Sequence, residues 1–330
     1  MTLVIGTDEA GYGPNLGPLV IGATAWQVER VANAAEAQLT SAVAETLASL
    51  SDGSPPVVWR DSKEVYRGGA GRPLLLHSAI TALCLITDAA PRTWHDLAAA
   101  VGQIDPQAVD TSPEWQTLAD RPLLDADGAS AIRADAERIA AGLASHGVRL
   151  QAVRCRCIYP GRFNQLLDGG MNKSDILSRE TLNLAATLAD DLGADDDSTL
   201  IWCDRHGGRK RYAGVIAASF DCQAEALEET AERSVYRLAA GGLFGGSTAR
   251  DTQLEFAVRS ERRPPVAVAS LTAKLTRELA MECFNAFWCA QLPGLGPTAG
   301  YPVDAARWRE QAAPVIQRLR IASERLWRQV

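Results

Sequence analysis

Two adjacent carboxylates stand directly after an apolar run at the beginning of the chain. Residues 3–5 (Leu-Val-Ile) favour a buried strand, and this strand runs into Asp8 and Glu9. Carboxylates at the end of a buried strand are costly unless a positive charge lies beside them, and a divalent cation is the usual partner. The pair therefore predicts a metal site. The alternative is a surface turn with two solvated acids.

The segment after these acids requires an unusual backbone. Between Gly11 and Pro18 the chain carries three glycines and two prolines. Glycine permits positive φ and the close approach of another molecule, while proline fixes φ and removes a donor. Neighbouring side chains on a strand point to opposite faces, so Asp8 and Glu9 converge only if the strand ends or twists there. The glycines permit such a twist.

A second apolar run ends in an acid near the middle of the chain. Residues 199–204 predict a strand that ends at Asp204, and residues 205–211 then contain a Gly-Gly pair and four cations. Because Mg²⁺ and Mn²⁺ prefer oxygen ligands, a site for two such ions needs acids from separate elements. Asp204 therefore joins Asp8 and Glu9 as a candidate ligand. His206 orients a ligand, contacts a phosphate or is an exposed loop histidine.

The run Asp-Glu-Ala-Gly-x-Gly-Pro-x-x-Gly-Pro at residues 8–18 resembles the N-terminal signature of the type 2 ribonucleases H, the ribonuclease HII and HIII family. Segments 61–63 (Asp-Ser-Lys), 269–278 and 300–302 (Gly-Tyr-Pro) match the family in the same order. The resemblance covers roughly residues 1–80 and 150–303. It implies a metal-dependent endonuclease with a two-metal Mg²⁺ or Mn²⁺ site, which cleaves the RNA strand of RNA–DNA hybrids and leaves 5′-phosphate and 3′-hydroxyl ends.

The resemblance also implies a role for each matching residue. Asp8, Glu9 and Asp204 would hold the metal. The substrate would be bound by the backbone around Gly11, Tyr12 and Gly13, by phosphate contacts from Lys63, Arg209, Lys210, Lys274 and Arg277, and by Tyr301 packed on a sugar. Without the resemblance, Lys63 is equally a solvated loop lysine.

The fourth acid departs from the family pattern. The usual spacing before the 269–278 motif reaches Ser260, whereas Glu261 lies one residue nearer. Either the link is one residue shorter and Glu261 is the fourth catalytic ligand, or the site has three carboxylates. We favour Glu261, because Pro264 and Pro265 make an altered link plausible. Asp251 and Glu255 are less favoured alternatives.

The absence of a histidine after Gly300-Tyr301 is a smaller departure from the family. Another departure concerns substrate choice: Tyr12 stands where ribonuclease HII usually carries an arginine. Phe163-Asn164, followed by Asn172, resembles the ribonuclease HIII branch. The last two features favour long RNA tracts over a single ribonucleotide.

Composition limits the classes of function. The 330-residue chain has a formal net charge of −7, which argues against a general nucleic-acid coat protein but is compatible with a nuclease whose acids bind metal. Seven dispersed cysteines without a C-x-x-C motif are typical of a reducing cytoplasm. No apolar run is long enough to span a membrane. A different nuclease on the same fold, a non-catalytic nucleic-acid-binding relative and a domain unrelated to nucleic acids are the rival readings.

The order of elements predicts an α/β protein with a ribonuclease-H-like mixed sheet flanked by helices. We expect a catalytic domain over residues 1–290, an insertion at 88–150 and a C-terminal helical segment at 291–330. Predicted strands cover residues 3–9, 18–28, 57–59, 149–158, 199–204, 234–238 and 254–258. Predicted helices cover residues 30–50, 74–86, 129–145, 174–193, 266–288 and 304–330, with Ser174 as an N-cap and a break near Pro314.

Overall fold

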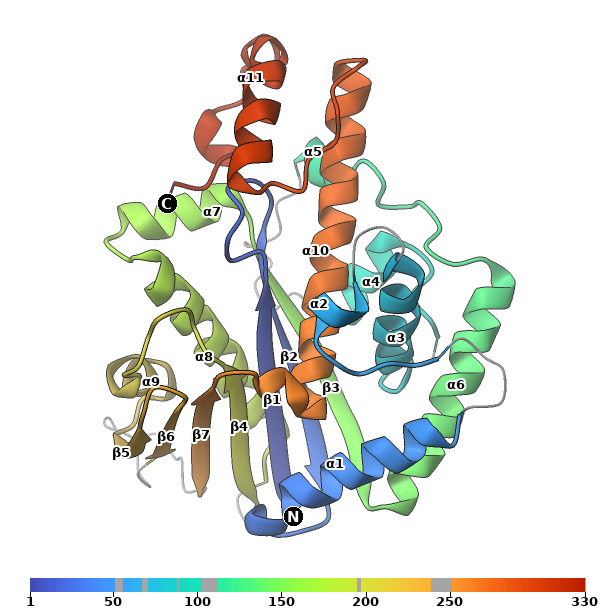
Figure 1. The fold of residues 1–330 in the computed structure, drawn as a ribbon, viewed down its shortest axis with the longest axis vertical. Coiled ribbons are helices and arrows are strands. Elements are labelled where there is room, and N and C mark those ends of the chain that lie inside the picture. The colour runs from blue at the N-terminus through green and yellow to red at the C-terminus, as the bar shows by residue number, and fades with distance from the viewer. Residues whose placement is uncertain are drawn as a thin grey trace.

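The computed structural model of the chain describes residues 1–50, 56–66, 71–87, 89–102, 112–194, 197–238 and 251–329. Within these ranges a seven-stranded mixed sheet has the order β3-β2-β1-β4-β7-β6-β5 (Figure 1). The strands are β1 (Thr2–Ala10), β2 (Leu19–Val28), β3 (Val148–Ile158), β4 (Ser198–Asp204), β5 (Ala224–Glu229), β6 (Arg233–Leu238) and β7 (Thr252–Ala257). The predicted mixed sheet flanked by helices is confirmed.

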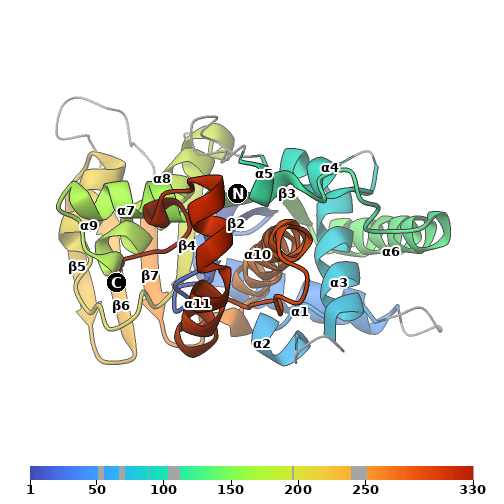
Figure 2. The ribbon, with the colours of Figure 1, turned by 90° about the horizontal axis from the view of Figure 1, so that it is seen from above.

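Helices cover both faces of this sheet, and Figure 2 shows α8 and α10 on opposite sides of it. The helices are α1 (Ala32–Ala48), α2 (Ser62–Val65), α3 (Arg72–Cys84), α4 (Trp94–Ala100), α5 (Pro113–Gln116), α6 (Ala126–Ser145), α7 (Pro160–Asp168), α8 (Lys173–Leu192), α9 (Ala213–Phe220), α10 (Pro264–Gln291) and α11 (Pro302–Leu319), with 3₁₀ turns η3 (Ser260–Arg262) and η4 (Ser323–Arg325). Helix α11 and η4 form the predicted C-terminal helical extension.

The pairing of β1 sets the geometry of the sheet. β1 runs antiparallel to β2 and parallel to β4, and β4 runs parallel to β7. Thr7 of β1 pairs with Cys203 of β4, and Asp204 pairs with Ala257 of β7. The carboxyl ends of β1, β4 and β7 therefore meet at one edge of the sheet.

Strand alternation divides the core into two layers. Leu3 and Ile5 of β1 pack in the layer that contains α8 and α9, whereas Val4 packs in the layer that contains α3 and α10. Helix α10 approaches β1 so closely that a Cβ at Gly6 would lie 2.3 Å from the backbone of Pro265. The small side-chain volume at Gly6 is what lets α10 begin next to the end of β1.

The predicted insertion holds α4, α5 and α6 in its described part, and residues 88 and 103–111 of it lie outside the described ranges. Helix α6 packs on α1 and α3, and α5 packs on α10. Trp115 of α5 stacks on Phe284 of α10 with the ring centroids 5.0 Å apart. Its status as an insertion, and the division into residues 1–290 and 291–330, stay predictions.

Three local expectations differ from the structure. Residues 57–59 are not a strand: Val58 N and Trp59 Nε1 donate to Ser78 of α3 instead of joining the sheet. Asn172, not Ser174, caps α8, because its side chain accepts a hydrogen bond from Asp175 N at 2.9 Å. Pro314 lies inside a continuous α11 and does not break it.

Six cysteines are buried and Cys289 is half-buried, and none of the seven forms a disulfide. In the described part of the chain, no helix combines the length and apolar character that crossing a membrane requires. The cytoplasmic location stays a prediction.

We expect Gly6→Ala to lower the free energy of unfolding by about 2–3 kcal/mol, because the added methyl group forces α10 away from β1. Gly214→Ala is the matched control, since nothing lies within 4 Å of a Cβ there. It should be neutral or stabilising by at most about 1 kcal/mol. Urea unfolding of both variants makes the measurement, and equal stabilities would contradict the close approach.

Candidate active site

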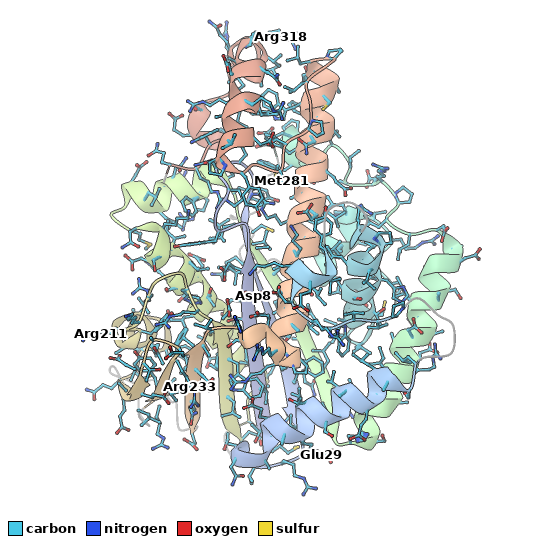
Figure 3. The ribbon with its side chains drawn as sticks, viewed as in Figure 1. Asp8, Glu29, Arg211, Arg233, Met281 and Arg318 are labelled. Carbon is cyan, nitrogen blue, oxygen red and sulfur yellow. The ribbon has the colours of Figure 1, made fainter. Side chains whose placement is uncertain are left out.

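Three carboxylates lie where the parallel strands have their carboxyl ends. Asp8 and Glu9 precede the last residue of β1, and Asp204 is the last residue of β4. Figure 3 shows Asp8 near the centre of the molecule, close to the start of α10. All three residues keep partial solvent exposure. The strand ends thus bring Asp8 and Asp204 close enough for each to affect the other's charge.

Asp8 and Asp204 share one face of the sheet, and Glu9 belongs to the other. The alternation of Val4 and Ile5 between the two core layers places even-numbered residues of β1 on the α10 side. β1 stays paired with β2 through its last residue, so it does not end between Asp8 and Glu9. Of the two ways in which Asp8 and Glu9 could converge, an end of the strand between them is therefore absent.

Burial and mutual repulsion raise the pKa values of all three carboxyl groups. Burial, and then Asp204, raises the pKa of Asp8 to about 7. Burial, and then Glu261, raises the pKa of Asp204 to about 6. Burial, followed by Asp8 and Asp204, also raises the pKa of Glu9. A raised carboxyl pKa means that the ionised form is destabilised, so this cluster is electrostatically suited to receive a cation.

Glu261 reaches this cluster through the 3₁₀ turn η3. Arg259 adopts a left-handed conformation with φ 63°, and the chain then turns so that Ser260 N donates to Asp204 Oδ1 at 3.2 Å. The next residue, Glu261, lies near enough to raise the pKa of Asp204. The turn thus places Glu261 beside the site despite the altered spacing.

Glu255 is in a different environment. It is 4 % exposed, and Arg233 Nη2 and Arg263 Nη1 bind its carboxylate at 2.9 and 2.8 Å. Although burial opposes them, these two arginines lower the pKa of Glu255. Asp251 precedes β7 at the opposite end of that strand and lies 3.9 Å from Arg237. Both acids therefore have cationic neighbours of their own, whereas Glu261 adjoins Asp204.

Lys63 supplies the positive charge that the cluster has. Burial lowers the pKa of Lys63, but Asp61, Asp8 and further acids of the cluster outweigh it and raise the pKa. Asp61 caps α2 by accepting from Lys63 N at 2.9 Å. The Ser62 and Ser270 hydroxyls are hydrogen-bonded at 2.9 Å, and a hydrogen bond from Ser270 stabilises ionised Asp8. The 61–63 and 269–278 motifs are thus connected to Asp8.

In the described part of the chain, no three carboxylate, imidazole or thiol groups converge closely enough to hold a metal ion. Two causes are visible in the structure. Alternation along β1 separates Glu9 from Asp8, and like charges this close repel one another when no cation lies between them. The chemistry of the donors nevertheless fits Mg²⁺ or Mn²⁺, since oxygen ligands from three separate elements meet at one edge of the sheet.

The predicted phosphate contacts fall into two groups. Lys210 is exposed, and Arg209 is bound to Asp175 while its Nε donates to Ser174 at 3.2 Å. Lys274 and Arg277 are engaged within the protein. Lys274 Nζ lies 2.7 Å from Glu278 and 4.6 Å from the ring centroid of Tyr66. Arg277 is only 2 % exposed. The guanidinium of Arg277 is thus enclosed by the protein and is not presented to a phosphate at the surface.

The glycine loop carries two aromatic neighbours. Tyr301 is 53 % exposed, and its ring lies 3.9 Å from the position of a Cβ at Gly13. Lys173 Nζ lies 4.7 Å from the ring centroid of Tyr12, which also flanks Gly207. An exposed face of this loop with an aromatic ring beside it suits contact with a sugar–phosphate backbone.

His206 is buried, which contradicts the reading as an exposed loop histidine. Its side chain is enclosed by Tyr212 and Phe256, and its Nδ1 lies 3.0 Å from the Ser178 hydroxyl. Burial, and then Arg209, lowers its pKa to about 3. A neutral imidazole hydrogen-bonded in the core positions the chain after Asp204.

Two residues near the site, Ser270 and Arg328, are not among the site residues that the sequence predicts. Ser270 belongs to a recognised motif, so its contact with Asp8 could have been inferred from the family match. Arg328 has no sequence signal, because it lies outside every motif, yet its guanidinium donates to Gly11 O at 2.7 Å.

No protein-family model and no curated protein sequence matches the chain. Ribonuclease H2 from Pyrococcus horikoshii OT3 is 14% identical, with a TM-score of 0.41 over 98% of this chain and 92% of that one. A chain of the PCNA:RNase HII complex from Archaeoglobus fulgidus is also 14% identical, with a TM-score of 0.42 over 98% and 93%. Bst-RNase HIII in complex with Mn²⁺ is 15% identical, with a TM-score of 0.41 over 96% and 62%. Similarities this distant carry no argument about activity.

We expect metal-free Asp8→Asn protein to be more stable than the wild type at about pH 8, by the order of 1 kcal/mol, because one of the repelling charges is gone. Folded Asp8 binds its proton more tightly than unfolded Asp8, so the wild-type free energy of unfolding falls as pH rises from about 4 to about 7. The variant should lose Asp8's part of this fall. Urea unfolding in EDTA at several pH values makes the measurement.

Glu255→Gln is the matched control, because it removes a carboxylate that two arginines already bind. It should destabilise the metal-free protein by about 2–3 kcal/mol. A stability loss of the same size in Asp8→Asn would contradict the repulsion that we infer.

Proposed function

We propose that this chain is a metal-dependent endonuclease that cleaves the RNA strand of RNA–DNA hybrids and leaves 5′-phosphate and 3′-hydroxyl ends. One observation carries the proposal: Asp8, Glu9 and Asp204 crowd at the carboxyl edge of the sheet, and their pKa values stay raised although Lys63 lies beside them. Glu255, only a few residues from η3, shows that the same fold supplies two arginines to a buried carboxylate that is structural. The order of the four family motifs supplies the substrate class.

The donor set fits a site for Mg²⁺ or Mn²⁺. Asp8, Glu9, Asp204 and Glu261 would hold the metal, all through carboxylate oxygens. When bound, the metal supplies an activated water and stabilises charge on the leaving 3′-oxygen. Like-charge repulsion in this cluster would fall on metal binding, since the raised pKa values of Asp8 and Asp204 come partly from neighbouring acids.

The chain's own side chains orient the reacting groups. Ser270 holds Asp8 by a hydrogen bond, and the Ser260 amide holds Asp204 at 3.2 Å. Lys63 keeps its proton, since acids around it raise its pKa, and so presents a fixed positive charge to the scissile phosphate. Fixed donors of this kind favour the more highly charged transition state over the ground state.

The remaining strand contacts would come from the exposed parts of the site. Lys210 and Arg209 follow β4 and would contact phosphates, and Tyr301 would pack on a sugar beside Gly13. Lys274 could contact a phosphate only by giving up its 2.7 Å contact with Glu278. Because these cations would make the phosphate contacts, we expect substrate affinity to fall as salt rises. The slope should be shallow, since it scales with the number of phosphates neutralised and these cations are few.

A non-catalytic or differently specific nucleic-acid-binding relative on the same fold is the alternative. A labelled RNA–DNA hybrid, a duplex with one ribonucleotide and plain DNA, each tested with Mg²⁺, Mn²⁺ or EDTA, separate the two. Cleavage of RNA-containing substrates that stops in EDTA supports the proposal. Binding without cleavage supports the alternative.

We expect Asp204→Asn to lower the cleavage rate by about 10³-fold or more while the fold is retained, because one carboxylate ligand and its charge are lost. Single-turnover cleavage of a labelled hybrid gives the rate, and circular dichroism gives the fold. Near-normal activity would contradict the assignment of Asp204.

Glu261→Gln and Glu255→Gln separate the two readings of the fourth acid. Glu261→Gln should lower the rate across a Mn²⁺ titration, and excess metal should restore part of it, because a ligand is weakened. Glu255→Gln should lower stability and leave the rate of the folded fraction close to that of the wild type. The reverse result would make Glu255 the ligand.

We expect faster cleavage within a run of ribonucleotides than at a single ribonucleotide in duplex DNA. Tyr12 lacks the charge-assisted phosphate contact that an arginine would give, and a junction offers only one 2′-hydroxyl to recognise. Both rates are measured at one salt concentration. Equal or faster cleavage at the single ribonucleotide would show that junction reading does not need the arginine.

A further inference from the structure

Residues 323–329, here called the strap, cross the loop formed by residues 11–17. Leu16 and Trp327 form an antiparallel bridge, and Arg328 N donates to Asn15 O at 2.8 Å. Figure 1 shows the C-terminal end of the chain beside α7 and next to the segment that follows β1. Two segments about 300 residues apart in sequence are therefore joined at the edge of the candidate active site.

Arg328 is the main contact between the strap and the loop. It is 1 % exposed, and its guanidinium donates to Gly11 O at 2.7 Å and to Pro14 O, while it lies 5.2 Å from the ring centroid of Phe163. Burial, and then the nearby Arg277, lowers its pKa to about 9. A buried cation is costly, and among the described residues no carboxylate pairs with Arg328. Loop carbonyls provide part of its compensation through Nη2.

Arg277 of α10 acts on the same loop from another side. Its Nη2 donates to Leu16 O at 3.4 Å and to Ala299 O at 3.0 Å. At Gly11, where φ is +85°, an added Cβ would lie 2.3 Å from Arg277 Nε. The two buried arginines thus hold the carbonyl oxygens of the loop on its inner side.

The inward carbonyls fix the direction of the loop amides. In a trans peptide the C=O of one residue and the N–H of the next point in opposite directions. Because Gly11 O points to Arg328, the Tyr12 amide points outward. Gly13 is exposed, and neither it nor Tyr12 donates its amide to an acceptor in the described part of the protein.

We propose that Arg328 is a positioning residue that holds the 11–17 loop with the Tyr12 and Gly13 amides facing outward, as donors to a backbone phosphate of the nucleic-acid substrate. The ligand in this proposal rests on the proposed function. Successive outward amides form a site for an anion. Lys173 Nζ lies 4.7 Å from the Tyr12 ring centroid and adds a positive charge next to the loop.

The strap has a second anchor that does not touch the loop. Asn164 of α7 donates to Glu324 O at 2.8 Å and to Trp327 O at 2.7 Å, and it accepts from Gln329 N at 2.8 Å. Removing the Asn164 amide therefore loosens the strap without changing the Arg328 side chain or the sequence of the loop. Two independent substitutions can thus test one mechanism.

The test compares Arg328→Ala, Arg328→Lys and Asn164→Ala in the full chain, with Arg318→Ala as the matched control. Arg318 is exposed near the end of α11, where it donates to Gln291 O at 3.2 Å (Figure 3). Binding of a labelled RNA–DNA hybrid is measured by fluorescence anisotropy in EDTA, and amide hydrogen exchange reports on residues 11–17.

We expect Arg328→Ala and Asn164→Ala each to weaken hybrid binding about tenfold and to speed exchange within residues 11–17. Arg328→Lys should recover part of the affinity, since an ammonium reaches one carbonyl but lacks the planar fork. Arg318→Ala should leave binding and loop exchange unchanged. A general loss of stability would instead speed exchange throughout the sheet.

Unchanged binding and loop exchange in folded Arg328→Lys and Asn164→Ala protein would overturn the role of Arg328, even if Arg328→Ala fails to fold. Failure of the wild-type chain to bind any hybrid would contradict the proposed function and the phosphate ligand named here. The wild-type measurement therefore separates the two failures.

Discussion

The crowding of carboxylates at the carboxyl edge of the sheet is the constraint on which the rest of the site depends. Parallel pairing of β1 with β4 sets the ends of the two strands side by side, and this brings Asp8 next to Asp204. Each neighbouring element then contributes one restraint: a hydroxyl from α10, an amide from η3 and the ammonium of Lys63 from α2. None of these removes the repulsion, so the fold retains a local instability that a bound cation would relieve.

Other buried charges among the described residues receive more compensation than these acids. Glu255 has two arginines. The guanidiniums of Arg277 and Arg328 donate to loop carbonyls through Nη2, although their Nε atoms have no hydrogen-bond partner among the described residues. His206 avoids the problem by staying neutral. Since the same chain supplies two arginines to the structural Glu255, the incompletely compensated acids at the strand ends are better explained by chemistry than by packing. This contrast supports the proposed metal site more strongly than acid content could.

The sequence predicts the elements that are apolar or belong to a motif. β1, β4 and α10 follow from apolar runs and from the 8–18 and 269–278 motifs. β5 and α9 were missed, because β5 (Ala224–Glu229) is largely acidic and exposed and α9 is short. Residues 57–59 were wrongly assigned to a strand, since periodicity does not reveal that Ser78 satisfies their donors. The place of Glu261 depends on a left-handed residue at Arg259, which no sequence pattern indicates.

The direction of the amides in the glycine loop depends on long-range contacts that the sequence of the loop alone does not predict. Tyr12 replaces an arginine of the family signature, which removes one cation from the outer side of the loop. Arg277 and Arg328 act from the inner side, where they bind carbonyls and so fix the direction of the amides. A phosphate would then meet oriented N–H dipoles rather than a flexible guanidinium. Oriented dipoles bind any backbone phosphate and do not distinguish an RNA–DNA junction from an RNA tract. The loop therefore contributes affinity for the strand rather than specificity for one substrate.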